Sequence, residues 1–299
     1  MTTQVKTKEG VVAVVGKPNV GKSSLVNILI GRKVTITSRR PQTTRNQIYS
    51  LLRAGQWQLT VVDTPGIHEC KTLFGSHINR SARRSIKGAD IVMMVIDARG
   101  WRREDEIVWN AIKDFAGHLL LILNKVDLLH AREGLLPLIS QCNERDGITE
   151  IIPFSARSGH NLDRLISCLK KLTPIGTHDV ISEPNLPNNT SFVVGEFIRE
   201  QVFRLAGAEI PYRTAVKVER YLGQGHKLPE FHAEIWVETA GQKAILLGKG
   251  GSRLRNIGER ARSSAARSLG TDIVLKTRIK VHRGWSSDPS SLRKLGYLE

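Results

Sequence analysis

The stretch VVAVVGKPNVGKS, residues 11–23, decides the fold of the first half of the chain. Five apolar residues lead into a GxxxxGKS turn, and residues 24–30 continue with the apolar spacing of a helix. A strand, a glycine-rich turn and a helix in this order place backbone N–H groups around a phosphate, at the positive end of the helix dipole. The sequence therefore predicts a phosphate-binding loop. It comprises Gly16, Lys17, Pro18, Asn19, Val20, Gly21, Lys22 and Ser23.

Two side chains of this loop are expected to carry most of its chemistry. Lys22 would reach the β- and γ-phosphates of a nucleotide, and the Ser23 hydroxyl would bind Mg²⁺. A chance glycine-rich turn before a helix is the alternative. The strand before the turn and the helix after it favour the phosphate loop.

Further apolar runs follow the first, separated by helix-like segments of about ten residues or more. They are LTVVD at 59–63, DIVMMVID at 90–97, HLLLILN at 118–124 and EIIPF at 150–154. Continuous Val, Ile and Leu runs indicate strands covered on both faces, as in a parallel sheet between layers of helices. The segment 46–63 instead predicts a hairpin that turns at Ala54-Gly55 and adds an antiparallel edge strand. We therefore expect residues 1–175 to form a doubly wound α/β domain with a mostly parallel six-stranded sheet.

A second element of the site follows the strand at 59–63 and supplies a carboxylate. It comprises Asp63, Thr64, Pro65, Gly66 and Ile67. A carboxylate at a strand tip beside the phosphate loop can support Mg²⁺, and the N–H of Gly66 can donate to a γ-phosphate. These residues are also common in ordinary turns, so the prediction depends on their position after the strand.

The identity of the nucleotide base is predicted from the motif Asn124-Lys125-Val126-Asp127, which lies at the end of the strand 118–124. The Asp127 carboxylate can accept hydrogen bonds from both the ring N–H and the exocyclic amino group of guanine, a donor pair that adenine lacks. Asn124 can tie this turn to the phosphate loop, and the stem of Lys125 can lie along the base. An isolated NKVD would be a charged surface turn. As the third element in this order, it indicates guanine.

Two more segments complete the predicted nucleotide site. Ser155 and Ala156 follow the strand 150–154, and their backbone N–H groups could face the guanine carbonyl, with an ordinary strand-to-helix turn as the alternative. Thr43 and Thr44 lie in the polar loop 33–46, where nucleotide switches place the threonine that senses Mg²⁺ and γ-phosphate.

The pattern changes after residue 173, which marks a domain boundary. Residues 173–190 contain three prolines and show no periodicity, so we assign a linker to 176–194. Beyond it, residues 195–299 have the order helix, strand, strand, helix, helix, strand, which predicts an α+β domain around a three-stranded sheet.

The two middle helices of this second domain are joined by Gly248-Lys249-Gly250-Gly251. A GxxG turn within the order α-β-β-α-α-β is typical of a type II KH domain, where it clamps a nucleic-acid backbone. Glycines allow close approach to phosphate, and Lys249 adds a charge. We expect Arg253 and Arg255 to take part in RNA binding with this turn.

The charge around the turn supports a polyanion partner. Residues 243–283 carry eleven Lys and Arg against two acidic residues, although arginines far from the turn could form a solvated helix face. Four apolar residues could line a groove for bases, but residues at such spacings are more often core. They are Ile235, Ile245, Leu246 and Ile257.

Bulk composition narrows the partners and the compartment. The 299 residues include 45 Lys and Arg against 28 Asp and Glu, a net charge of +17, so nucleic acid is the first expected partner and anionic membrane the second. The three cysteines form no CxxC pair, so neither disulfides nor zinc are expected and a reducing cytosol fits. The polar N-terminus and the short apolar run at 11–15 predict neither a signal peptide nor a membrane span.

These motifs resemble the Era family of bacterial GTPases, over nearly the whole chain. The similarity lies in GKPNVGKSSLVNILIGRKVTITSRRPQTTR, DTPGI, NKVD and SAR, and later in EFIREQVFRLAGAEIPY, GQKAILLGKGGSRLRNIG and RKLGYLE. The resemblance implies a slow GTPase that binds GTP or GDP with Mg²⁺, binds 16S ribosomal RNA near its 3′ end and acts in assembly of the 30S subunit. It also implies a cytoplasmic location with peripheral contact with the inner membrane, and we expect a monomer.

The resemblance assigns metal binding and part of catalysis to single residues. The QTTR of the family makes Thr44 the residue that senses Mg²⁺, so the predicted metal ligands are Ser23, Thr44 and Asp63. Lys22, Thr44 and Gly66 are the expected catalytic residues around the γ-phosphate. The chain departs from the family pattern in having GKSS for GKST, which keeps the hydroxyl ligand, and in the extra glycine of GKGG.

The resemblance also implies a role for a monovalent cation. Ile67 occupies the position where Ras-like enzymes have the glutamine that orients the attacking water, and isoleucine cannot do so. Similar GTPases with an apolar residue there use the asparagine at the position of Asn19 to hold K⁺. Such a cation would stabilise the charge of the departing γ-phosphoryl group. The alternative is that Asn19 only stabilises its loop.

Three other functions stay open at this point. Ile67 is compatible with an RNA-binding chaperone whose nucleotide is mainly structural. A membrane-associated GTPase would use the basic surface, including Arg80, Arg83, Arg84 and Lys87. An ATP-using phosphate-loop protein is the third, and Asp127 argues against it.

Overall fold

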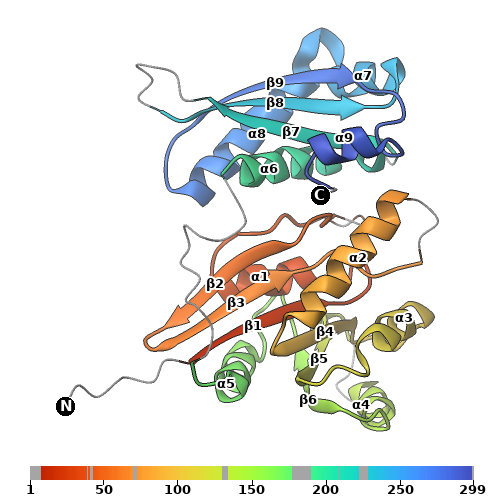
Figure 1. Ribbon diagram of the computed structural model, residues 1–299, viewed down its shortest axis with the longest axis vertical. Coiled ribbons are helices and arrows are strands. Elements are labelled where there is room, and N and C mark those ends of the chain that lie inside the picture. Colours follow the sequence, from red (N-terminus) through yellow and green to blue (C-terminus); the bar gives the residue numbers. More distant parts are fainter. Residues whose placement is uncertain are drawn as a thin grey trace. The chain divides into compact units, whose positions relative to one another are not determined.

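The computed structural model describes residues 8–38, 40, 43–69, 73–129, 134–176, 190–207, 209–221 and 228–297, without the side chains of Leu73, Arg220 and Tyr221. The chain forms two compact units (Figure 1). The first comprises Met1–Thr35, Thr44–Cys70 and Ile78–Pro187, and the second Ile36–Thr43, Lys71–His77 and Asn188–Glu299. Most of the predicted linker, at 177–189, lies outside the described residues.

A six-stranded sheet with the order β2-β3-β1-β4-β5-β6 forms the centre of the first unit. Its strands are β1 (Lys8–Val15), β2 (Ile48–Ala54), β3 (Trp57–Asp63), β4 (Ile91–Asp97), β5 (His118–Asn124) and β6 (Ile148–Phe154). Among the described strand pairs of this sheet, the pairing of the edge strand β2 with β3 is the only antiparallel one. The mostly parallel sheet predicted from the apolar runs is thus confirmed.

The hairpin between β2 and β3 turns one residue later than predicted. Ala54 still pairs with Trp57 in the ladder, so the turn is Gly55-Gln56 rather than Ala54-Gly55. Gly55 has φ 62, the left-handed conformation that a two-residue hairpin turn favours. The sequence indicated the glycine correctly, and the ladder pairing decided its place in the turn.

Helices cover both faces of this sheet (Figure 1). They are α1 (Lys22–Ile30), α2 (Leu73–Lys87), α3 (Arg103–Ile112), α4 (Leu135–Asn143) and α5 (Leu162–Leu172). Val12 and Val14 of β1 enter the core under α1 and α5, whereas Ala13 and Val15 enter the opposite core under α2, α3 and α4. Because alternate residues enter different cores, the strands are apolar without interruption. The loops after β1, β3, β5 and β6 meet at the carboxyl edge of the sheet, where such folds bind ligands.

The second unit has a three-stranded sheet with the order β7-β8-β9. Its elements are α6 (Thr190–Leu205), the 3₁₀ turn η4 (Ile210–Arg213), β7 (Thr214–Tyr221), β8 (Glu230–Val237), α7 (Ala240–Leu247), the 3₁₀ turn η5 (Lys249–Gly251), α8 (Ser252–Leu269), β9 (Val274–Val281) and α9 (Pro289–Lys294). β7 and β8 pair antiparallel, and β8 and β9 pair parallel. The predicted α-β-β-α-α-β order of a KH domain is confirmed.

Two helices of the second unit differ from the sequence-based expectation. α6 begins at Thr190, inside the predicted linker 176–194, because Val194 is buried in the core and extends the helical pattern toward the N-terminus. The short helix α9 was not predicted. It begins at Pro289, and the side chain of Asp288 accepts hydrogen bonds from the backbone N–H groups of Ser290 and Ser291.

Two segments from the first half of the sequence belong to this second unit. Ile36 is 1% exposed within the core formed by α6, α8 and the sheet. Phe74 packs edge-on against Tyr297 and Trp285, with ring centroids 4.8 and 5.9 Å apart. The loop after α1 and the start of α2 therefore share the core of the KH unit.

Candidate nucleotide site and nucleic-acid clamp

The loop after β1 has backbone conformations that only glycine adopts without strain. Gly16 and Gly21 have φ 151 and 100. A Cβ at Gly16 would collide with the carbonyl oxygen of Val95, and one at Gly21 with the amide of Asn124. Gly21 is also the N-cap of α1 and supplies no side-chain cap, so the first N–H groups of the helix are available for an anion.

Lys22 is held in the middle of this loop. Its Nζ donates to the carbonyl oxygens of Gly16 and Lys17, both at 2.9 Å, and the residue is 6% exposed. Burial lowers the pKa of Lys22 to about 8, against the opposing charge of Asp63. A polyphosphate would favour the charged ammonium again, which matches the predicted role of Lys22.

Three oxygen ligands predicted for Mg²⁺ lie together. Ser23 Oγ donates to Asp63 Oδ2 at 2.7 Å, and Thr44 Oγ1 lies 2.9 Å from Ser23 Oγ and 3.5 Å from Asp63 Oδ2. Asp63 is fully buried, and its Oδ1 has no hydrogen-bond partner among the described residues. Burial raises the pKa of Asp63 to about 6, against the hydrogen bond from Ser23 and the charge of Lys22. Hard oxygens with an unpartnered buried carboxylate oxygen fit a magnesium ion.

The turn after β3 packs directly against the phosphate loop. Thr64 Oγ1 donates to the carbonyl of Val14 at 2.7 Å, and Pro65 follows it as a buried residue. A Cβ at Gly66 would lie 2.8 Å from the backbone nitrogen of Pro18, so a larger residue cannot occupy this position without displacing the loop. Gly66 therefore lies directly against the phosphate loop.

Ile67 does not point at reacting atoms. Its side chain is 1% exposed and lies in the core with Ala82 and Ile86 of α2. The next residue is His68, which was not among the predicted site residues. Its Nδ1 lies 2.8 Å from the carbonyl oxygen of Gly66. The apolar side chain of Ile67 thus cannot orient a water molecule at the phosphates.

The side chain of Asn124 connects three loops. Its Nδ2 donates to the carbonyl of Val20 at 2.8 Å, and its Oδ1 accepts from the N–H of Ala156 at 3.0 Å. The predicted tie to the phosphate loop is present. Asp127 Oδ1 accepts from the hydroxyl of Ser155 at 2.6 Å. The side chain of Ser155 thus orients the carboxylate, and the N–H of Ala156 is engaged by Asn124.

Two lysines of the site form ion pairs with acidic residues that were not predicted as part of it. Lys125 Nζ donates to Asp97 Oδ2 at 3.0 Å and to the carbonyl of Asn19 at 2.7 Å. Although burial alone raises the pKa of Asp97, hydrogen bonds from Arg99 and Lys125 outweigh it and hold this pKa well below its usual range. Lys17 pairs with the buried Asp105 at 2.7 Å. Asp97 ends the apolar run 90–97, and that position at a strand tip was an available signal.

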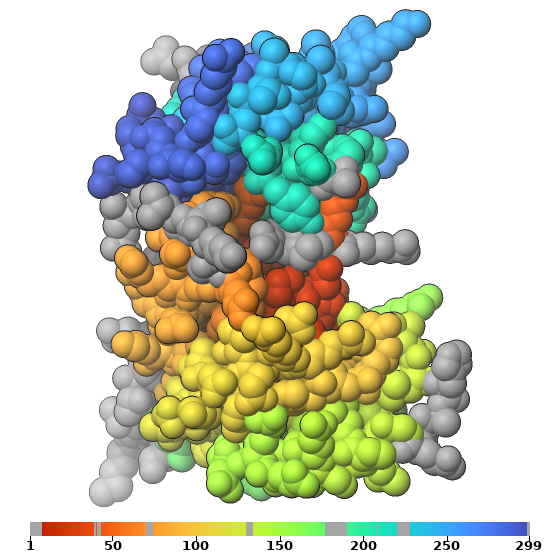
Figure 2. All heavy atoms as spheres, turned by 90° about the vertical axis from the view of Figure 1, so that its right-hand side faces the viewer, coloured from red at the N-terminus to blue at the C-terminus, as the bar shows by residue number. Residues whose placement is uncertain are grey.

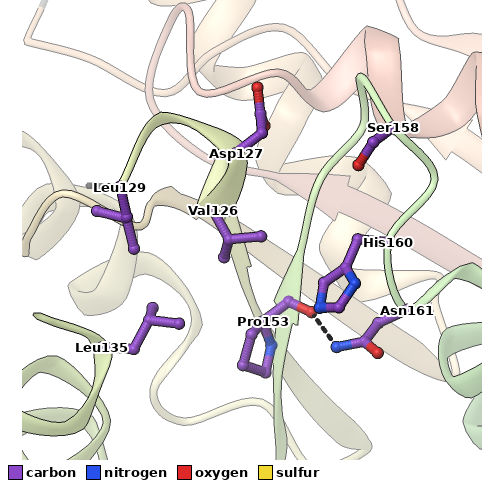
Figure 3. A pocket seen from close by; sticks show the side chains of 8 residues that line it. All are labelled: Val126, Asp127, Leu129, Leu135, Pro153, Ser158, His160 and Asn161. Atoms are coloured by element: carbon purple, nitrogen blue, oxygen red, sulfur yellow. Dashed lines mark hydrogen bonds between the residues drawn. The ribbon is translucent and has the colours of Figure 1, made fainter. Parts of the chain in front are cut away.

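A pocket of about 370 Å³ lies beside the turn that carries Asp127 (Figure 3). Its lining comprises Val126, Asp127, Leu129, Leu135, Pro153, Ser158, His160 and Asn161. Asn161 donates to the carbonyl of Pro153 at 2.7 Å, as the dashed line shows. The carboxylate of Asp127 projects away from Val126, Leu135 and Pro153. The carboxylate therefore remains available to a base outside the apolar part of this pocket.

The GKGG turn precedes α8 and contains three glycines with positive φ, a conformation that favours glycine. Gly248, Gly250 and Gly251 have φ 70, 58 and 77. A Cβ at Gly248 would lie 2.9 Å from the Cβ of Arg253, so close packing also requires glycine there. Gly251 is the N-cap of the 18-residue α8 without a side-chain cap, which leaves N–H groups for a phosphate.

The charged and apolar residues around this turn have separate roles. Lys249 and Arg255 are exposed, whereas the guanidinium of Arg253 donates to the carbonyl of Ile245 at the end of α7. Ile245 is 46% exposed. The other groove candidates, Ile235, Leu246 and Ile257, are fully buried core residues. Of the four, only Ile245 is available to a base.

Profiles of two protein families match this chain. One family, described as a 50S ribosome-binding GTPase, matches residues 11–125, and the other, described as a KH domain, matches residues 209–286. The two matches lie in the two halves that the fold separates. They agree with the nucleotide site and with the GKGG turn.

Curated relatives match over nearly their full length. GTPase Era of Stenotrophomonas maltophilia strain K279a is 39% identical over 298 residues, covering 99% of this chain and 100% of the relative. GTPase Era of Xanthomonas axonopodis pv. citri strain 306 is 40% identical over 291 residues, or 97% of each chain.

Two solved structures agree in fold with a TM-score of 0.92 and 35% identity, covering 98% of this chain and 100% of theirs. One is a single-residue variant of Aquifex aeolicus Era bound to GDP and AlF₄⁻. The other is Era in complex with MgGDPNP and nucleotides 1506–1542 of 16S ribosomal RNA.

Proposed function

Because the chain belongs to the GTPase Era family and is a GTPase, we propose that it is a GTP-driven switch that binds 16S ribosomal RNA near its 3′ end. We further propose that it acts in the maturation of the 30S ribosomal subunit, in the cytoplasm and as a monomer. The observation that carries the proposal is the presence, in one chain, of the Ser23–Thr44–Asp63 oxygen cluster and of the uncapped GKGG turn. The experiments below test its separate parts.

The geometry assigns each nucleotide contact to one side chain or backbone group. Ser23, Thr44 and Asp63 would hold Mg²⁺, which neutralises charge on the β- and γ-phosphates when bound. Lys22 would bind the same phosphates from the loop, and the Gly66 N–H would donate to the γ-phosphate. The Thr44 hydroxyl lies beside Ser23 and would change its contacts with the presence or absence of the γ-phosphate.

Hydrolysis is expected to depend on charge stabilisation, since the buried Ile67 cannot orient water. We propose that Asn19 holds K⁺ beside the phosphates. Asn19 is exposed at φ 64 in the phosphate loop, and Lys125 donates to its carbonyl. The side chain therefore starts from a fixed backbone position at the rim of the site.

Replacing Na⁺ by K⁺ in the assay buffer is expected to raise the hydrolysis rate about tenfold or more, because a cation in this position offsets charge in the transition state. Asn19→Gly should remove the difference, since glycine tolerates the same φ. Asn161→Gly is the matched control, because Asn161 has φ 63 outside the phosphate loop. Equal rates of the native protein in the two buffers would contradict the role of Asn19.

Coupling between nucleotide and RNA is supported by the segment around Thr43. Within the KH unit, the buried Arg199 of α6 donates to the carbonyl of Thr43 and pairs with Glu196 at 2.8 Å. The next residue, Thr44, lies with Ser23 and Asp63 in the nucleotide unit. A change at Thr44 would therefore be passed through one peptide bond to a segment held by α6.

We expect RNA matching the 3′ end of 16S ribosomal RNA to bind at least about tenfold more tightly in the presence of a GTP analogue than of GDP or no nucleotide. This corresponds to about 1.4 kcal/mol of coupling. The measurement is a titration in the three nucleotide states, with the clamp variant Lys249→Glu as a control that should weaken binding in all three. Equal affinities in the three states would leave two independent modules and favour the RNA-chaperone alternative.

Membrane contact is the weaker alternative. In the parts of the chain that the structure describes, no helix is long and apolar enough to cross a bilayer. Adsorption of the basic surface by charge alone should be lost at physiological salt, which vesicle sedimentation would measure.

A further inference from the structure

One face of α2 carries four cations that none of the proposed contacts uses. Arg80, Arg83, Arg84 and Lys87 are exposed and follow the spacing i, i+3, i+4 and i+7, so they lie on one side of the helix. We call this the α2 cationic face. The 15-residue helix LFGSHINRSARRSIK contains no acidic residue. Figure 2 shows the surface of α2, in orange, open to the viewer.

The opposite face of α2 is occupied by the protein core. Ile78, Ala82 and Ile86 are 3%, 0% and 6% exposed, and the last two pack in the core beside Ile67. The helix is therefore fixed by its apolar side. Its exposed side contributes little to that packing, and its residues are available to a partner.

Three of these four charges have no ion-pair partner in the described parts of the chain. Arg80, Arg83 and Lys87 form no ion pair with any residue that the structure describes, whereas the exposed Arg164 pairs with Glu150 at 2.9 Å. Like charges three and four residues apart repel one another in a helix. The helix dipole favours cations only in the last turn, which does not include Arg80. An external anion would offset the repulsion.

We propose that the α2 cationic face binds the phosphate backbone of structured RNA, as a second contact in addition to the GKGG clamp. The inference rests on the proposed RNA-binding function. Three of the four residues are arginines, whose planar guanidinium groups match phosphate oxygens in pairs. Several such contacts on a rigid helix supply affinity and position without reading sequence.

RNA fits this face better than an anionic membrane does. A helix that lies on a membrane buries an apolar face among the lipids, but Ile78, Ala82 and Ile86 are already buried in the protein. Only charge is left, and charge alone adsorbs weakly to membranes at physiological salt. A polyphosphate backbone needs only charge and hydrogen-bond donors.

The test replaces Arg80, Arg83 and Lys87 together by glutamine in the full-length protein. Arg84 stays because it makes contacts within the fold. Glutamine keeps high helix propensity, so α2 should persist. The probes are protein-free full-length 16S ribosomal RNA and a short RNA with only its 3′ end. Each is titrated over a range of salt concentrations, and GTP hydrolysis is measured in parallel.

The variant is expected to bind full-length RNA at least about tenfold more weakly. The slope of log affinity against log salt concentration should decrease in magnitude by about 2 to 3. Each lost phosphate contact accounts for about one unit of this slope. Affinity for the short RNA and the hydrolysis rate should not change. The matched control removes the same charge elsewhere, with Lys113, Lys170 and Lys171 replaced by glutamine, all of them exposed. It should retain the native salt dependence.

Each other outcome has a distinct meaning. Unchanged binding and salt dependence of the α2 variant would overturn this inference alone. An equal loss in both variants would reduce the effect to net charge and overturn it too. If the native protein bound neither RNA, the proposed function would fail as well. Loss of binding to anionic phospholipid vesicles at physiological salt, with RNA binding intact, would assign the face to membranes instead.

Discussion

Asp127→Asn is expected to lower the affinity for GTP by about four to five orders of magnitude. The carboxylate of Asp127 would accept from two donors of guanine, and an amide offers one acceptor and one donor in the same space. A buried guanine donor would then face an N–H group, and sites that match hydrogen bonds in this way discriminate by about 10⁴ to 10⁵. Titration of the variant with GTP, GDP and ATP measures the loss.

The same substitution should favour a different base. Xanthine has a carbonyl where guanine has its amino group, so the side-chain amide of the variant could donate to it, and xanthosine triphosphate should bind the variant more tightly than GTP does. The Ser155 hydroxyl can still donate to the amide oxygen, so the fold should persist. Asp163→Asn, at an exposed position of α5, is the control. GTP binding within tenfold of the native value would place base recognition elsewhere.

Lys22→Ala is expected to lower the rate of GTP hydrolysis by about 10² to 10³. Lys22 is the buried ammonium at the centre of the phosphate loop, and preorganised groups at developing charge contribute rate factors of this size. The loss should appear in kcat as well as in kcat/KM, because charge on the phosphates grows toward the transition state. Steady-state rates measured over a range of GTP concentrations, from below KM to saturation, give both constants.

The control for Lys22 is the exposed Lys113, whose replacement by alanine should leave hydrolysis unchanged. Circular dichroism and thermal unfolding would show whether the Lys22 variant keeps its fold. A folded variant with more than a tenth of the native rate would sink the assignment of Lys22. It would also strengthen the view that the nucleotide is mainly structural.

The elements of the fold could be predicted because their signals are local. Uninterrupted apolar runs indicated buried parallel strands, and Gly16, Gly21 and Gly66 marked loops where a side chain would collide with a neighbour. The KH order followed from the sequence of strands and helices around GKGG. These features need only short windows of sequence.

Other features depend on contacts between distant residues, which spacing does not reveal. The hairpin turn lies one residue later than predicted, because Ala54 still pairs with Trp57 in the ladder. Ile235 and Ile257 proved to be core, and only Ile245 is exposed. The pairing of Lys17 with Asp105, 88 residues apart, and the membership of residues 36–43 in the second unit have no local signal.

The three-way connection made by Asn124 has a kinetic consequence. One amide joins the phosphate loop, the guanine turn and the turn after β6, so loosening of any one of these loops affects hydrogen bonds of the same side chain. Opening of the site for departure of a nucleotide would disturb this shared amide, so we expect the residence time of GDP to depend on Asn124. The delay before GTP can bind again should then depend on this one side chain at the tip of β5.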